Sequence, residues 1–261
     1  MDMAARVRQH HREGALVFDP GAESTQHCVR RHFLTAVLSI DALGGNYTDV
    51  IEWIDYHTIV GFDHFVLIDQ VRTESFSALI HPYLSNNIVE LVNATCTAGD
   101  PCWPSCDPQC ISTQFFNRSG WASNVSTRIL GDTFWVSFSD LDEFIAPHPR
   151  STSLVDMLIA LTTCSRRKSR MLGSLFLQWQ GNFGPNGHVT KPESRVIEAY
   201  TARAAAGCCN GKSVSLADAV VGMHPHVPYL KAGFSHATFL YSWGGVFFFV
   251  NNGGGPEKAL L

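Results

Sequence analysis

An apolar run that ends in acids spans Phe134 to Phe144. Phe134 to Phe138 are aromatic, β-branched or small residues, which predicts a buried strand. Because side chains alternate along an extended chain, we expect Asp140 and Asp142 on one side and Leu141 directed into the core. Two carboxylates at a strand end favour Mn²⁺ or Mg²⁺, and a diphosphate bridged by that ion. The alternative is a polar strand end that continues into a turn.

The segments before this run alternate between strand and helix patterns. We expect the first core strand within Cys28 to Ile40, then a helix from Val50 to Val60 that stops at Gly61. Phe65 to Ile68 predicts a buried strand that ends at Asp69. This strand–helix–strand order, with an acid at the strand end, is typical of a nucleotide-binding α/β unit. The glycine motifs of dinucleotide-binding and P-loop proteins are absent.

The rest of the chain continues the α/β pattern. The further expected elements are a helix over 75–84 broken near Pro82, a strand over 88–92, a partly helical 114–130, a helix over 154–161, a strand over 172–180, a helix over 196–203, a loop-to-strand segment over 214–221 and two core strands within 234–250. A chain of 261 residues is long enough for one large domain, and no linker or internal repeat divides it. We therefore predict a tail over 1–27, one domain over 28–233 and a C-terminal segment over 234–261 of unassigned status.

Cysteines and sequons bear on the compartment. Cys96, Cys102, Cys106 and Cys110 crowd a loop-like segment without the paired C-x₂-C spacing of common zinc sites. Glycosylation sequons begin at Asn46, Asn93, Asn117 and Asn124. Together these features predict a disulfide-bonded glycoprotein of the secretory pathway, in the Golgi lumen or membrane. The connectivity cannot be deduced from spacing.

Charge and hydropathy exclude some partners. A net charge of −4 gives no electrostatic basis for nucleic-acid binding. Residues 1–14 are polar and basic and do not form a signal peptide. The expectation is that a membrane anchor, if the protein has one, lies in a segment missing from or atypical in this chain.

Two motifs resemble glycosyltransferase family 92. The run from Glu52 to Asp69 (EWIDYHTIVGFDHFVLID) is similar to the family's E-W, Y-H and G-x-D-H-F pattern, and Trp135 to Phe144 is similar to its W-x₄-D-x-D-E-F. A looser similarity covers Trp179 with Phe183-Gly184, then Lys212-Ser213 and the segment that holds His224 and His226. The chain departs from the family pattern before the E-W helix, after Asp69 and at its C-terminus.

The resemblance implies a GT-A-like fold, a Rossmann-like mixed sheet flanked by helices in a single domain. It implies a UDP-sugar donor, a glycan or glycoprotein acceptor, and transfer of a hexose, galactose being favoured, with inversion. The metal would be held by Asp140, Asp142 and one of His224 and His226. This would neutralise the charge of the leaving diphosphate.

The remaining site assignments are donor contacts by Asp69 and Glu52, and Glu143 as the general base that inversion requires. Two alternatives stay open. A glycosidase fits poorly, because carboxylates two residues apart on one strand cannot easily flank a glycosidic bond at ~5–9 Å. A non-catalytic pseudoenzyme or glycan-binding module of the same fold is motivated by the departures from the family pattern.

Overall fold

The structure, a computed structural model, describes residues 30–40, 47–69, 74–94, 98, 110, 122–147, 153–165, 171–182, 187–190, 194–202, 211–223, 226–238 and 247–251. Its helices are α2 (Thr48–Val60), α3 (Glu74–Ser85), α5 (Ala122–Asp132), α6 (Leu154–Ser165) and α7 (Val196–Ala199), with a short 3₁₀ helix η1 (Ala217–Ala219). Its strands are β1 (His32–Ile40), β2 (His64–Asp69), β3 (Val89–Asn93), β4 (Thr133–Phe138), β5 (Glu143–Pro147), β6 (Met171–Asn182), β7 (Gly211–Leu216), β8 (Val220–Met223), β9 (Pro228–Leu230), β10 (Phe234–Thr238) and β11 (Phe247–Asn251).

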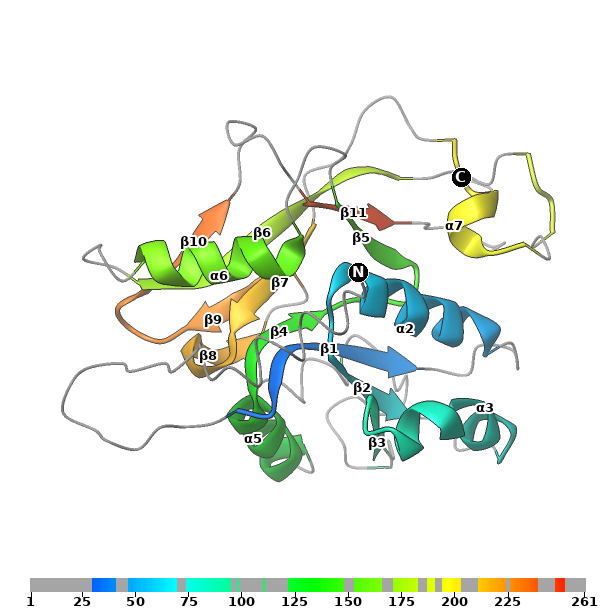
Figure 1. The fold of residues 1–261 in the computed structure, drawn as a ribbon, viewed down its shortest axis with the longest axis horizontal. Helices are drawn as coiled ribbons and strands as arrows, with labels where there is room; N and C mark the ends of the chain where they lie inside the picture. Colours follow the sequence, from blue (N-terminus) through cyan, green and yellow to red (C-terminus); the bar gives the residue numbers. More distant parts are fainter. Residues whose placement is uncertain are drawn as a thin grey trace.

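The strand order sets where a ligand can bind. The main sheet runs β3-β2-β1-β4-β7-β6-β11-β5, with β10 beside β6 (Figure 1). The four strands from β3 to β4 are parallel, whereas β7 is antiparallel to β4 and β6. The chain passes from β1 outward to β2 and β3, then returns to the other side of β1 with β4. The strand order therefore reverses between β1 and β4, and open α/β sheets bind ligands outside the carboxyl ends of the strands at such a point.

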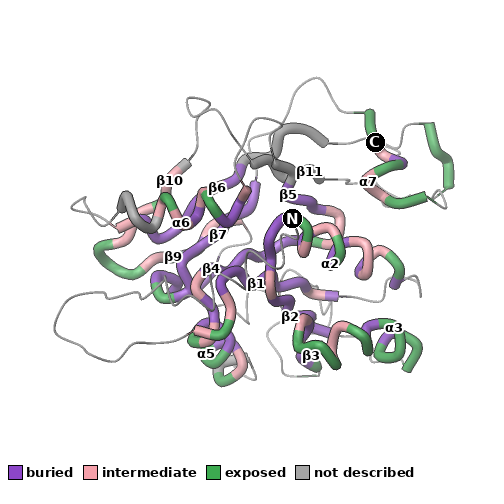
Figure 2. Tube along the Cα trace, in the orientation of Figure 1, coloured by how far each residue is buried: buried purple, intermediate pink, exposed green. Residues whose placement is uncertain are grey.

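Helices cover both faces of this sheet because the strands bury side chains on both sides (Figure 2). On one face Leu34 and Leu38 of β1 join a core with α2, α3 and α6, in which Trp53 and Leu158 are fully buried. On the other face Val37 joins a smaller core that contains α5, η1 and β8. The mixed sheet with flanking helices that the sequence predicts is confirmed.

The end of α2 depends on a glycine. Gly61 lies in the left-handed region at φ 117°, and its N–H bonds to His57 O and Thr58 O. A Cβ at Gly61 would lie 2.7 Å from Val155 Cγ2 of α6. Both the backbone conformation and the packing against α6 therefore require glycine here.

Gly61→Ala should lower the free energy of unfolding by about 1–3 kcal/mol, from backbone strain and the contact with Val155. Gly131→Ala is the matched control. A Cβ at Gly131 of α5 meets no atom within 4 Å, so stability should stay unchanged or rise by up to ~1 kcal/mol. Urea denaturation of both variants measures the difference, and equal destabilisation of the two would contradict the packing argument.

One expected helix break needs correction, and one expected pair of strands is confirmed. The helix over 75–84 is not broken at Pro82, because α3 continues to Ser85. Only three residues follow the proline, and the side chains of Ser85 and Asn86 donate to Pro82 O. The two strands expected within 234–250 are found as β10 and β11, because β10 pairs with β6 and β11 pairs with β5 and β6.

Among the helices of the described residues, none is both long and apolar enough to cross a membrane.

Candidate donor-binding site at the carboxyl edge

The acids of the D-x-D motif lie on a tight turn that joins β4 to β5. Strand β4 ends at Phe138, and the turn is closed by Glu143 N, which donates to Asp140 O at 3.1 Å. The expectation that Asp140 and Asp142 alternate along an extended strand is therefore wrong in its geometry. Leu141 does pack against the main core, as expected. The turn nevertheless leaves both aspartates at the carboxyl end of β4, beside the reversal point of the sheet.

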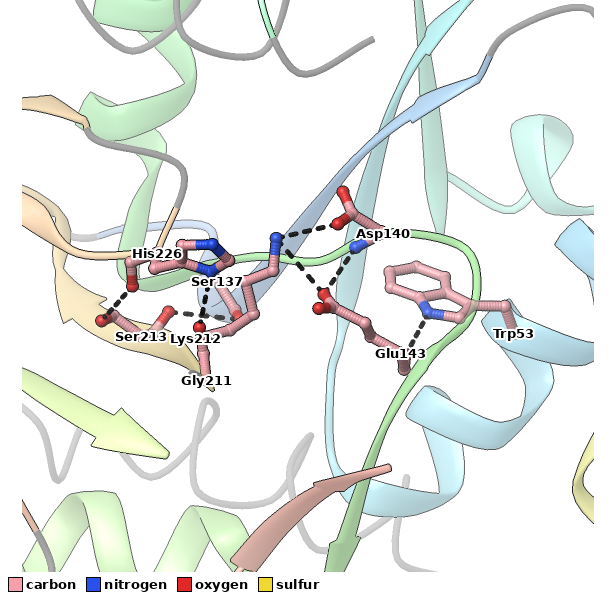
Figure 3. A network of polar contacts seen from close by, with 8 residues as sticks. All are labelled: Trp53, Ser137, Asp140, Glu143, Gly211, Lys212, Ser213 and His226. Carbon is pink, nitrogen blue, oxygen red and sulfur yellow. Dashed lines mark hydrogen bonds and ion pairs between the residues drawn. The ribbon is translucent and has the colours of Figure 1, made fainter. Parts of the chain in front are cut away.

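A lysine that was not among the predicted site residues completes this turn. Lys212 Nζ lies 3.0 Å from Asp140 Oδ2 and 3.4 Å from Glu143 Oε2 (Figure 3). Its side chain is only 3% exposed, whereas that of Asp140 is 56% exposed. Glu143 is fully buried, and its Oε2 also accepts from Asp140 N at 2.9 Å. The carboxylate of Asp140 is thus exposed to solvent, whereas that of Glu143 is buried and paired with the buried Lys212 ammonium.

Burial and charge act in opposite directions on these groups. Burial raises the pKa of Glu143 to about 8, although the neighbouring Lys212 opposes the rise. Burial alone would lower the pKa of Lys212, but the carboxylates of Glu143 and Asp140 raise it above its ordinary value. Glu143 Oε1 makes no hydrogen bond within the described structure. Glu143 is fully buried, and its role as general base stays a prediction.

Two residues of α2 form hydrogen bonds to the backbone of the turn and of β5. Trp53 Nε1 donates to Glu143 O at 2.9 Å (Figure 3). His57 is fully buried, with Nδ1 2.8 Å from Trp53 O and Nε2 3.3 Å from Ile145 N. Because Ile145 N–H can only donate, Nε2 carries the lone pair and Nδ1 carries the proton. The Trp and His of the first motif therefore connect α2 to the start of β5.

His57 makes stability depend on pH. Burial lowers its pKa from 6.5 to about 3, so below pH 6.5 the unfolded chain takes up a proton that the native state does not. The His57 contribution is present above pH 6.5 and is lost as pH falls toward 3, by about 1.4 kcal/mol per pH unit.

Between pH 6 and 5, His57→Gln should reduce the pH slope of unfolding free energy by about that amount relative to wild type. His64 and Glu143 titrate in both proteins, so their contributions cancel in the difference. An unchanged slope would contradict a neutral, buried His57.

The two predicted donor contacts lie in different environments. Asp69 ends β2 next to Ile40 of β1 and Asn93 of β3, and is buried at the carboxyl edge. Glu52 instead accepts from Val196 N at 2.8 Å and Ile197 N at 3.1 Å. Both of its oxygens thus bind the first N–H groups of α7. A donor role stays a prediction for each residue, and Glu52 has a structural role besides.

The predicted metal ligands are only partly brought together. Among the described residues no group of three His, Cys, Asp or Glu side chains surrounds an ion position. His226 lies beside Lys212, with Nδ1 3.0 Å from Gly211 O, and His224 lies outside the described residues. Asp140 and Asp142 still fit a divalent ion, since Mg²⁺ is commonly held by one or two carboxylates together with substrate phosphates.

A cavity of about 560 Å³ lies at the amino ends of the parallel strands, away from the D-x-D turn. It is lined by residues at the amino ends of β1, β2 and β3, including His32, His64 and Val89, and by Arg128 of α5. Because the D-x-D turn follows the carboxyl end of β4, this cavity is not part of the candidate site.

A mixed α/β sheet with a carboxylate turn at the carboxyl edge is the arrangement expected of a GT-A-type glycosyltransferase. The model of glycosyltransferase family 92 matches residues 36–232, and the chain belongs to this family. That range includes the turn, Lys212 and the α2 residues beneath it. Lys212 could have been found from the Lys-Ser pair of the looser motif, because a lysine within an otherwise buried strand needs a counter-charge.

The structural comparison gives distant similarities. S. aureus TarS 1-349 matches with a TM-score of 0.34 at 14% identity, over 62% of this chain and 39% of that one. Mannosyltransferase PcManGT from Pyrobaculum calidifontis, in complex with GDP-Man and Mn²⁺, matches with a TM-score of 0.32 at 12% identity, over 68% and 47%. The mannosyltransferase Ktr4p from S. cerevisiae matches with a TM-score of 0.33 at 13% identity, over 68% and 49%. The chain thus aligns with less than half of each of these proteins. No curated protein matches it significantly.

Proposed function

We propose that the chain is a metal-dependent glycosyltransferase that moves a hexose, galactose being favoured, from a UDP-sugar to a glycan acceptor with inversion. The observation that carries this proposal is the position of the Asp140 turn, at the carboxyl end of β4 and beside the reversal point of the sheet. An exposed carboxylate and a buried cation at that edge suit a nucleoside diphosphate bridged by a divalent ion.

The residues at the site have separate roles in this proposal. Asp140 and Asp142 would hold Mn²⁺ or Mg²⁺, which neutralises the charge of the leaving diphosphate. Asp69, at the carboxyl end of β2, would contact the nucleotide. Trp53 and His57 keep the turn in place through Glu143 O and Ile145 N.

Donor hydrolysis tests the proposal without an identified acceptor. Release of UDP from UDP-galactose, UDP-glucose and UDP-N-acetylglucosamine should be measured with Mn²⁺ and with a chelator. The proposal expects metal-dependent release from at least one of them, with UDP-galactose preferred. A folded protein that releases UDP from none of these donors, and binds none, would favour a non-catalytic pseudoenzyme or glycan-binding module.

We also propose that the protein is a disulfide-bonded glycoprotein of the secretory pathway. Two sequon asparagines, Asn93 and Asn124, are exposed in the structure. Cys110 is half-buried, whereas Cys96, Cys102 and Cys106 lie outside the described residues, so their pairing remains a prediction. Material secreted behind a leader should lose mass on N-glycosidase treatment, and non-reducing peptide mapping should find bonds within the loop. Unglycosylated protein with four free thiols would refute this assignment.

A further inference from the structure

Lys212 places a positive charge beside Asp140, at the carboxyl end of β4. It is the second residue of β7, which is antiparallel to β4 with Ser137 opposite Val214. Continuing that register by two residues sets Lys212 opposite Ser139, at the carboxyl end of β4. Its location follows from the sheet and does not depend on a loop.

The two carboxylates that pair with Lys212 differ in their exposure to solvent. Glu143 is buried, whereas Asp140 is more than half exposed and reaches the open edge of the sheet. A buried ammonium is costly unless it is paired, and here two carboxylates lie within 3.4 Å. Glu143 alone could serve as a buried partner. The 3.0 Å contact with Asp140 additionally directs the cation to the surface where the donor would bind.

We propose that Lys212 is a built-in counter-ion of the donor site that competes with the divalent metal for Asp140. This inference rests on the proposed function. Without metal, Lys212 neutralises Asp140 and reduces the repulsion between the turn and the donor diphosphate, so UDP retains weak affinity. With metal, the same lysine opposes the ion, both by occupying Asp140 Oδ2 and by its own charge.

Removal of the lysine should therefore shift two affinities in opposite directions. In Lys212→Met, Mn²⁺ alone should bind at least about fivefold more tightly, because a like charge close to the ion is gone. UDP in the presence of a chelator should bind at least about fivefold more weakly, because Asp140 is no longer neutralised and repels the diphosphate. Lys212→Arg keeps the charge and should restore UDP binding toward the wild-type value.

Electron paramagnetic resonance of free Mn²⁺ gives the metal affinity, and calorimetry gives the UDP affinity. Since Lys212→Met leaves Glu143 without its cation, the double variant Lys212→Met/Glu143→Gln is measured as well, and should show the same opposite shifts. Circular dichroism and thermal melting confirm folding of each protein. A purely structural role predicts that both affinities fall together in Lys212→Met and its double variant.

The outcomes separate the two proposals. If wild type binds UDP with Mn²⁺ but neither affinity shifts in the variants, or both fall together, the counter-ion role is wrong and the donor site stands. If folded wild type binds neither Mn²⁺ nor UDP, the proposed function itself fails.

Discussion

Asp142→Asn is expected to reduce Mn²⁺-dependent transfer and donor hydrolysis by at least ~100-fold, because the amide removes half of the carboxylate pair that holds the ion. Asparagine keeps the size of the side chain, and Asp142 is half-buried in a turn closed by other atoms, Glu143 N and Asp140 O. The fold and melting temperature should therefore change little. Asp142 is a cleaner target than Asp140, whose replacement would also remove the contact with Lys212.

Asp156→Asn is the matched control, since this exposed acid lies on α6 and not at the carboxyl edge. It should retain wild-type activity at every Mn²⁺ concentration. Full activity of a folded Asp142→Asn would remove the metal role from this motif.

Trp53→Ala is expected to lower the free energy of unfolding by about 3–5 kcal/mol, since Trp53 is fully buried between the sheet and α2. Its ring contacts His57 and Phe65, with centroids 4.2 and 5.7 Å away. The substitution also removes the donor to Glu143 O, so the D-x-D turn should loosen and donor affinity should fall with stability.

A pair of conservative variants separates the hydrogen bond from the packing. Trp53→Phe keeps most of the ring but leaves Glu143 O without its donor. Trp135→Phe makes the same change at a tryptophan that is also fully buried, but whose Nε1 has no hydrogen-bond partner in the described structure. Trp53→Phe should therefore be the more destabilising by about 1–3 kcal/mol in urea denaturation. Equal losses would mean that the bond to the turn contributes nothing.

The sequence predicted those parts of the fold that local pattern determines. Dense apolar runs predicted β1 and β2, which are buried on both faces, and Gly61 as a stop signal predicted the end of α2. The break expected near Pro82 was wrong, because α3 continues for three residues beyond the proline, to Ser85. β5 was not predicted, because its residues follow the acids directly and were interpreted as part of the same run.

The carboxylates of the site could be predicted from the sequence, but the long-range partners that hold them could not. Asp140 and Asp142 were found from sequence because acids after an apolar strand are a local signal. Lys212 reaches the turn across 72 positions of the chain, and no periodicity reports a pairing at that separation. The same holds for Glu52, whose hydrogen bonds to the start of α7 are 144 and 145 positions away. Such partners are set by strand order, which the sequence pattern leaves open.

Calorimetry of UDP binding with Mn²⁺ and with a chelator tests most directly whether the Asp140 turn is a metal–diphosphate site. A divalent ion would reverse the sign of the interaction between the acidic turn and the diphosphate, so metal and donor should bind with positive coupling. UDP affinity should rise at least about tenfold with Mn²⁺, and Asp140→Asn/Asp142→Asn should lose most of this gain. Equal UDP affinity with Mn²⁺ and with chelator, in folded wild-type protein, would contradict it.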